Sequence, residues 1–452
     1  EICACLVGSE MCIRDRVCVM LAIGIYRCKW AVLEEAIIDN IRASASAIII
    51  LLLIGAIAGS WMVSGVVPTM IYYGLKILHP SFFLVASCAI CAGVSLMTGS
   101  SWTTIATIGV ALMGIGQAMG FPEGWIAGAI ISGAYFGDKI SLLSDTTVLA
   151  SSTVGVPIFT HIRYMLYTTV PSFVIALAVF VIAGLTLDHT GGTHAGMYAE
   201  SLRGTFRITP WLLAVPVATG VLIVRKLPAI VTLFCAAVFA CIAMLLAQPE
   251  LVAKVAGVGG LDFMSGFKGV LMSCFGPTAI PTGSPQLDEL VATRGMAGML
   301  NTVWLIICAM CFGGVMTGSG MLGALTSVFL RFVRRAFSAV ASTVGAGIFF
   351  NLCTADQYIS IILSGRLFRE LYAEQGLEPR LLSRSVEDSA TVCSVLVPWN
   401  SCGMTQATVL GVSTFVYMPY CIFNIVSPLM SLAVAAVGWR IKKAAGTAAH
   451  PH

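Results

Sequence analysis

The stretch "YFGDKISLLSDTT", residues 135–147, sets two aspartates, one lysine and several hydroxyl groups into a chain that is apolar on both sides. An ionisable side chain inside a membrane-spanning segment costs free energy, so it is rare and is functional by default. If the surrounding chain spans a membrane, Asp138, Lys139 and Asp145 are the first candidates for a functional site.

The composition points to a membrane. The 452 residues are 58% hydrophobic and only 10% charged, whereas soluble domains carry about 25% charged residues. Such a chain cannot cover a soluble surface. It predicts an all-α polytopic membrane protein, because lipid leaves backbone polar groups to be satisfied within helices. The apolar runs predict roughly ten to twelve crossings, each of about 20 residues.

Several other classes find no support in the sequence. A net charge of +4 gives no reason to expect a nucleic-acid partner. No Walker-type loop, Ser-His-Asp set or HExxH motif is present, so we expect a protein that is not an enzyme and uses no cofactor. The pairs Cys88/Cys91 and Cys308/Cys311 have metal-site spacing. They lie in apolar runs without a nearby histidine, which favours buried apolar side chains.

The two ends of the chain are interpreted separately. Residues 1–16, "EICACLVGSEMCIRDR", resemble translated sequencing-adapter DNA and are interpreted as non-native. Residues 17–29 would then be the remnant of a truncated transmembrane helix. The basic residues of 438–452 predict a cytoplasmic tail by the positive-inside rule.

The sequence contains an internal repeat. Gly59 falls on Gly314, 255 positions on, and further identities follow at the same offset. Repeat 1 is expected over 30–187 and repeat 2 over 285–437, joined by 188–284 with about two transmembrane helices. The pattern alone leaves open whether the repeats are parallel or inverted.

Each repeat begins with an amphipathic stretch, "LEEAIIDNIRA" (33–43) and "LDELVATRGMA" (287–297). A helix with charges on one side, followed by a long apolar run, is typical of a segment in the membrane interface. An ordinary loop helix is the equal alternative.

Polar residues interrupt each repeat twice, at 98–104 and 142–147 and again at 351–358 and 397–403. Irregular backbone at membrane depth is tolerated where it lines a cavity. Paired broken segments in two halves point to the binding site of a secondary transporter. The expected correspondences are Ser101 with Asp356, Asp145 with Asn400, and Thr146 with Ser401.

The breaks supply hard oxygen donors, which suit a small hard cation such as Na⁺. Asp145 lies between two hydroxyl residues and is the first choice for a ligand. A carboxylate can hold Na⁺ or a proton, but not both well at once, which is the minimal chemistry of Na⁺/H⁺ exchange. Asp356 would add a carboxylate from the second repeat. The expected ion ligands are Asp145, Ser144, Thr146, Ser101, Asp356, Asn400 and Ser401.

A second group of polar residues near the breaks could gate the site, bind a substrate or serve structure alone. Asp138 and Lys139 project about 100° apart on a helix and need not face each other. This group comprises Asp138, Lys139, Thr103, Asn351, Thr354, Arg366, Glu387 and Asp388, and Arg384 is a further candidate.

Five long stretches resemble NhaC-type Na⁺/H⁺ antiporters. They are "GSWMVSGVVPTMIYYGLKIL" (59–78), "TGSSWTTIATIGVALMGIG" (98–116), "SGAYFGDKISLLSDTT" (132–147), "ADQYISIILSGRLF" (355–368) and "LSRSVEDSATVCSVLVPWNSCG" (382–403). The resemblance implies two inverted repeats, each with a re-entrant hairpin and a broken transmembrane helix. It also implies that Ser144-Asp145-Thr146 is a charged version of the Ser-Asn-Thr sodium signatures of related carriers. Leu142 departs from the proline usual in this family, and Val148 from a polar residue.

The expected function is secondary active exchange of cytoplasmic Na⁺ for external H⁺ by alternating access. The expected partners are Na⁺, H⁺ and the lipid bilayer of a prokaryotic cytoplasmic membrane, with a homodimer as one conceivable assembly. The alternative is an exchanger of malate- or lactate-type anions or of amino acids, coupled to Na⁺ and H⁺. In that case Lys139, Arg366 or Arg384 would meet the substrate carboxylate.

Overall fold

A computed structural model describes residues 17–187, 199–225, 227–260, 262–282, 288, 291–322, 329 and 335–439. Within these residues the protein is helical, and the one β-bridge joins Thr278 to Thr293. The adapter-like segment 1–16 and most of the expected tail lie outside the described residues. The described chain begins with one short helix, residues 17–24.

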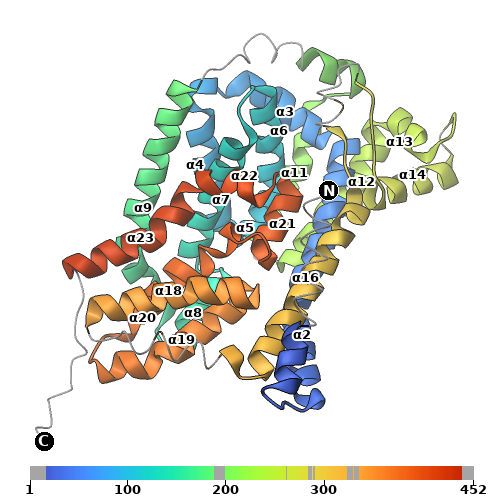
Figure 1. The fold of residues 1–452 in the computed structure, drawn as a ribbon. Coiled ribbons are helices and arrows are strands. Elements are labelled where there is room, and N and C mark those ends of the chain that lie inside the picture. Colours follow the sequence, from blue (N-terminus) through green and yellow to red (C-terminus); the bar gives the residue numbers. More distant parts are fainter. Residues whose placement is uncertain are drawn as a thin grey trace, which may run out of the picture.

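After that short helix, the first half of the chain contains nine elements from α2 to α9, whose α-helices are labelled in Figure 1. They are α2 (Trp30–Val63), α3 (Val66–Ile77), α4 (Pro80–Thr98), α5 (Ser101–Thr104), the π-helical η1 (Ile105–Gly109), α6 (Val110–Ala118), α7 (Glu123–Ile140), α8 (Asp145–Val154) and α9 (Ile158–Thr186).

The connecting segment adds a group of helices between the halves. They are η2 (Pro210–Leu213), α11 (Ala214–Val224), α12 (Ala229–Ala247), α13 (Pro249–Ala256) and α14 (Phe263–Phe275).

The second half contains α16 (Gly295–Gly318), α18 (Ala336–Thr354), α19 (Gln357–Glu374), α20 (Pro379–Val386), the π-helical η3 (Glu387–Thr391), η4 (Ser394–Leu396), α21 (Ser401–Leu410), α22 (Thr414–Tyr417), η5 (Met418–Tyr420) and α23 (Ile422–Val437).

Helix α2 corrects one expectation. The amphipathic stretch 33–43 is not a separate interfacial helix but the first part of a single 34-residue helix, Trp30–Val63. No glycine or proline interrupts the chain between Leu33 and Ile54, so nothing breaks the helix where a turn into the membrane was expected. Part of the matching stretch 287–297 lies outside the described residues.

The described residues contain fewer candidate spans than the apolar runs suggested. Six helices are long and apolar enough to cross a membrane, and nine spans result if each bent helix pair counts as one. The apolar run 409–437 is long enough for one span, but it is divided among the end of α21, α22, η5 and α23. Helix breaks therefore divide some of the apolar runs into helices too short to cross a membrane alone.

The helices of the two halves begin and end at matching positions. Helices α4 and α18 are both 19 residues long, and α8 and α21 are both 10. Left-handed glycines follow α8 at Gly155 and α21 at Gly411, 256 positions apart. The offset is still 255 at the left-handed pair Gly65 and Gly320. The second half therefore contains one more residue between α16 and the end of α18.

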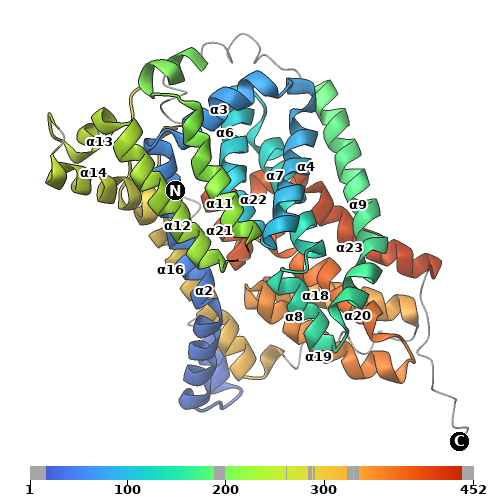
Figure 2. The same cartoon turned by 180° about the vertical axis from the view of Figure 1, so that it is seen from behind.

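Figures 1 and 2 show how the elements are placed. The long helices α2 and α16 pack side by side, with α12 against α2, along one flank of the molecule. Helices α4, α7, α9 and α23 pack together on the opposite side of the molecule from α2 and α16. In Figure 1, α8 and α18–α20 lie below them. Helix α6 returns to contact α3, so α4, α5 and α6 form a hairpin whose tip lies inside the molecule.

Candidate functional site

The first helix break lies between α7 and α8, which are bent by 46°. Ser144 caps α8, accepting the backbone N–H of Thr147 at 3.4 Å, and the Thr147 hydroxyl donates to the Lys139 carbonyl at 3.0 Å. Backbone groups released by the break thus find side-chain partners. The break forms with Leu142, and not a proline, between the two helices.

The tip of the first hairpin lies directly against this break. Gly99 is left-handed, with φ 67°, and a Cβ built there would lie 2.6 Å from the backbone carbon of Leu143. Ser100 follows as the N-cap of α5 and accepts the N–H of Thr103 at 3.2 Å. Only glycine combines this backbone conformation with so close an approach.

Asp138 joins the tip to the end of α7. Its Oδ2 accepts the backbone N–H of Ser101 at 3.1 Å and the Ser101 hydroxyl at 2.7 Å, and the side chain is buried. Asp138 therefore contacts the first tip, whereas Lys139, the next residue, pairs with Asp388.

A cavity of about 560 Å³ opens between the tip, the break and the flanking helices. Asp138 and Asp145 both line it, and Asp145 is exposed there. Its other polar lining is Ser46, Thr98, Ser100, Thr103, Thr146, Thr232, Gln357 and Tyr358, and α2, α11 and α12 supply a mainly apolar wall. No lysine or arginine is among the described residues that line it, so the cavity is acidic.

The second hairpin tip is built in the same way but holds its acid differently. Ala355 occupies the left-handed conformation, with φ 58°. Asp356 caps α19: its Oδ1 accepts the backbone N–H groups of Tyr358 and Ile359 at 2.8 and 3.0 Å. Its Oδ2 accepts the Ser401 hydroxyl at 3.2 Å. Asp356 is buried and does not line the acidic cavity.

The second helix break is closed against this tip. The N–H of Ser401 donates to the Ala355 carbonyl at 2.8 Å. Asn400 caps α21, accepting the N–H of Cys402 at 3.0 Å, and its amide donates to the Asn351 side chain at 3.2 Å. Asn400 and Ser401 thus lie together with Asn351 and Asp356, as expected, but outside the acidic cavity.

The caps shift the expected correspondence between the halves by one residue. The N-caps pair Ser100 with Asp356 and Ser144 with Asn400, so Asp145 corresponds to Ser401. The pairings of Ser101 with Asp356, Asp145 with Asn400 and Thr146 with Ser401 are each wrong by one position. Those pairings used the offset of 255, which no longer holds after the extra residue of the second half.

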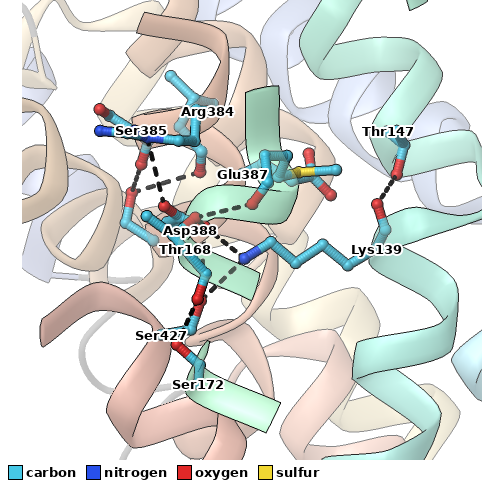
Figure 3. A network of polar contacts seen from close by, with 12 residues as sticks. Lys139, Thr147, Thr168, Ser172, Arg384, Ser385, Glu387, Asp388 and Ser427 are labelled. Atoms are coloured by element: carbon cyan, nitrogen blue, oxygen red, sulfur yellow. Dashed lines mark hydrogen bonds and ion pairs between the residues drawn. The ribbon is translucent and has the colours of Figure 1, made fainter. Parts of the chain in front are cut away.

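Behind the cavity lies a buried ion cluster, drawn in Figure 3. Lys139 forms an ion pair with Asp388 and donates to the Ser427 hydroxyl at 2.8 Å. The Thr168 hydroxyl also donates to Asp388, at 3.2 Å, and Arg384 approaches the second carboxylate oxygen at 3.9 Å. All three charged side chains are fully buried. The cluster joins α7 and α9 of the first half to α20, η3 and α23 of the second half.

Glu387 connects the cluster to the cavity. It opens the π-helical turn η3, and its Oε1 accepts the Thr146 hydroxyl at 3.3 Å. Thr146 also bonds Ser144 at 3.0 Å and lines the cavity. π-Helical turns are frequent at functional sites.

The remaining sequence candidates lie apart from the acids of the cavity. Asn351 donates to the Ala390 carbonyl at 2.7 Å, and Thr354 bonds Ser360 at 3.2 Å. Arg366 is exposed on α19 and does not line the cavity.

Sequence reasoning missed the cavity residues Gln357 and Tyr358 and the wall from α2 and α12. The corrected offset would have pointed to Gln357, which corresponds to Ser101. No sequence signal marks the apolar wall.

The chain is similar to several known proteins. The sequence model of the Na⁺/H⁺ antiporter family matches residues 133–439. The Na⁺/H⁺ antiporter NhaC of Alkalihalophilus pseudofirmus is 35% identical, over 94% of this chain and 90% of its own. The malate-2H⁺/Na⁺-lactate antiporter of Bacillus subtilis is 36% identical, over 86% and 80%. The arginine/ornithine antiporter ArcD of Halobacterium salinarum is 34% identical, over 91% and 83%.

Proposed function

The chain belongs to the Na⁺/H⁺ antiporter family, and from that premise we propose that it exchanges cytoplasmic Na⁺ for external H⁺ across a prokaryotic cytoplasmic membrane. The observation that carries this proposal is the acidic cavity, in which Asp138 and Asp145 lie at the junction of a hairpin tip and a helix break.

The donor set of the cavity suits Na⁺. Two carboxylates supply charge, and the hydroxyl groups of Thr98, Ser100 and Thr103 supply neutral oxygens. Protons and Na⁺ compete for the same carboxylate oxygens. Release of one ion from the cavity therefore favours binding of the other. Each direction of transport then carries one kind of ion, and no cofactor is required.

This assignment changes the acid that partners Asp145. Sequence reasoning chose Asp356, but both of its carboxylate oxygens already accept hydrogen bonds at the second tip. Asp138 lines the same cavity as Asp145, and Ser101 bonds only one of its two carboxylate oxygens. We assign Asp138 and Asp145 to the ion, and Asp356 to holding the second tip.

Alternating access by two inverted repeats is the transport mechanism that we propose. The matching helix lengths, caps and left-handed residues of the two halves support a duplicated unit. In Figure 1 the first hairpin, α4–α6, and the second, α18–α19, lie toward opposite ends of the molecule, which favours inversion.

The negative charge of the cavity favours some of the alternative substrates over others. An organic anion such as malate needs a basic partner, and no described lining residue is basic. Lys139 and Arg384 are committed to Asp388 in the buried cluster. A cationic amino acid is the better second candidate, because the cavity combines two carboxylates with Trp102 and Tyr358.

The test is Na⁺-driven proton flux in proteoliposomes, followed with a lumenal pH dye. Asp145→Asn and Asp138→Asn are each expected to lower the flux at least tenfold. Asp39→Asn removes an exposed carboxylate of α2 and is the matched control. Full activity of Asp145→Asn would refute the assignment. Uptake of labelled malate, lactate, arginine and ornithine in the same vesicles separates the alternatives.

A further inference from the structure

Corresponding positions of the two halves make corresponding hydrogen bonds. The Ser95 hydroxyl donates to the Ala134 carbonyl at 2.6 Å, and the Asn351 amide donates to the Ala390 carbonyl at 2.7 Å. The two donors are 256 positions apart, and so are the two acceptors. This is the offset that the helix caps give. Contacts present in one half therefore show what the other half can form.

At the second tip, the helix after the break is docked onto the hairpin. The N–H of Ser401 donates to Ala355, and the Ser401 hydroxyl donates to the carboxylate of Asp356. Both contacts join the first residue of α21 to the tip. The second tip is closed in this conformation.

At the first tip, the corresponding contacts are open. The residues equivalent to Ser401, Ala355 and Asp356 are Asp145, Gly99 and Ser100. Among the described residues, no hydrogen bond joins Asp145 to Gly99 or Ser100. All three instead line the acidic cavity.

The chemistry of the open pair mirrors that of the closed pair. The second half has its acid on the tip and its hydroxyl on the helix, whereas the first half has the hydroxyl on the tip and the acid on the helix. Ser100 Oγ accepts bonds from Thr103, and its own proton goes to no described acceptor. It is therefore free to donate to a carboxylate.

We infer that Ser100 is a positioning residue for Asp145: the first tip closes over the bound cation by bringing the Ser100 hydroxyl to the Asp145 carboxylate. This inference rests on the proposed function. The closed pair reproduces, with donor and acceptor exchanged between tip and helix, the contact between Ser401 and Asp356. Closure then holds Asp145 in one orientation, and opening releases the ion.

The decisive experiment exchanges the two residues. Ser100→Asp alone sets two acids opposite each other, and Asp145→Ser alone removes the acid from α8. Each is expected to lower Na⁺-driven proton flux at least tenfold. The double variant Ser100→Asp/Asp145→Ser restores an acid–hydroxyl pair in the arrangement of the second half. Its flux should recover at least tenfold over either single variant. A double variant no better than the weaker single variant would overturn the inference.

Aspartate at position 100 keeps the N-cap of α5, as Asp356 keeps that of α19, so the exchange preserves the local fold. Rescue of this kind is not expected if Ser100 serves only as a cap, because the cap is present in both single and double variants.

Cross-linking tests closure without depending on transport. Ser100→Cys with Asp145→Cys should form a disulfide, mapped by mass spectrometry, in membranes under mild oxidation. Asp356→Cys with Ser401→Cys is the positive control, because those side chains are already in contact. A cross-link at the control pair but none at the first pair refutes closure. A cross-link at both, with no Na⁺-driven flux in the unmodified protein, refutes the proposed function instead.

Discussion

Ser101 donates both its backbone N–H and its hydroxyl to the same oxygen of Asp138, at 3.1 and 2.7 Å. The first hairpin tip is thereby tied to the end of α7, while its other side faces the cavity. This contact fixes one of the two cavity carboxylates and leaves Asp145 to move relative to it. Four predictions follow from this and related contacts.

Ser101→Ala should loosen the tip. The variant keeps the N–H donor but loses the hydroxyl, and a hydrogen bond to a charged group contributes about 1.5–3 kcal/mol. We expect the free energy of unfolding to fall by about that amount, together with a weaker apparent affinity for Na⁺. Thermal unfolding in detergent and flux at graded Na⁺ concentrations measure the two effects. Ser152→Ala is the control, because that exposed hydroxyl bonds only its own helix. Equal behaviour of the two variants would show that the contact is dispensable.

A methyl group should be unfavourable at both tips, because both residues are left-handed. Gly99→Ala places a Cβ against Leu143 in a left-handed residue, and should cost about 1–3 kcal/mol of stability and most of the flux. Ala355→Gly removes a methyl group from a left-handed residue and should stabilise the protein by about 0.5–1 kcal/mol. Unfolding temperatures of the pair test this, and a Gly99→Ala variant as stable as the unmodified protein contradicts it.

Matching threonines brace the two tips. Thr98 bonds the Thr104 hydroxyl, and Thr354 bonds the Ser360 hydroxyl, each at 3.2 Å. Thr98→Val and Thr354→Val should each lower stability by about 0.5–1.5 kcal/mol, the net contribution of one hydrogen bond. Only Thr98 lines the acidic cavity, so only Thr98→Val should weaken Na⁺ binding. Isothermal titration with Na⁺ distinguishes them, and a weakened affinity in both variants would place Thr354 at the ion as well.

The buried pair of Lys139 and Asp388 should be costly to break on one side. Lys139→Met leaves Asp388 buried without its nearest cation, and Asp388→Leu leaves Lys139 in the same state. Each single variant should lose about 3–5 kcal/mol of stability, because an unpaired buried charge remains. The double variant removes both charges and should regain at least half of that loss. Additive losses in the double variant would show that the two side chains do not depend on each other.

Local sequence features determined much of this protein. Hydropathy identified an all-helical membrane protein, since twenty apolar residues in a row have few other solutions. The break positions were also readable, because Ser100, Ser144, Asp356 and Asn400 are capping residues whose preference is local. Asp145, chosen from its place at a break, lines the cavity.

Tertiary structure alone decided which polar residues meet. Lys139 and Asp388 are 249 positions apart, and the packing of α7 and of η3 against α23 brings them together. One extra residue in the second half shifts the offset between equivalent positions from 255 to 256, so Asp145 corresponds to Ser401 and not to Asn400. The acidic cavity needs α2 and α12 as its far wall, and which face of an apolar helix turns to a distant site is a property of packing rather than of its sequence.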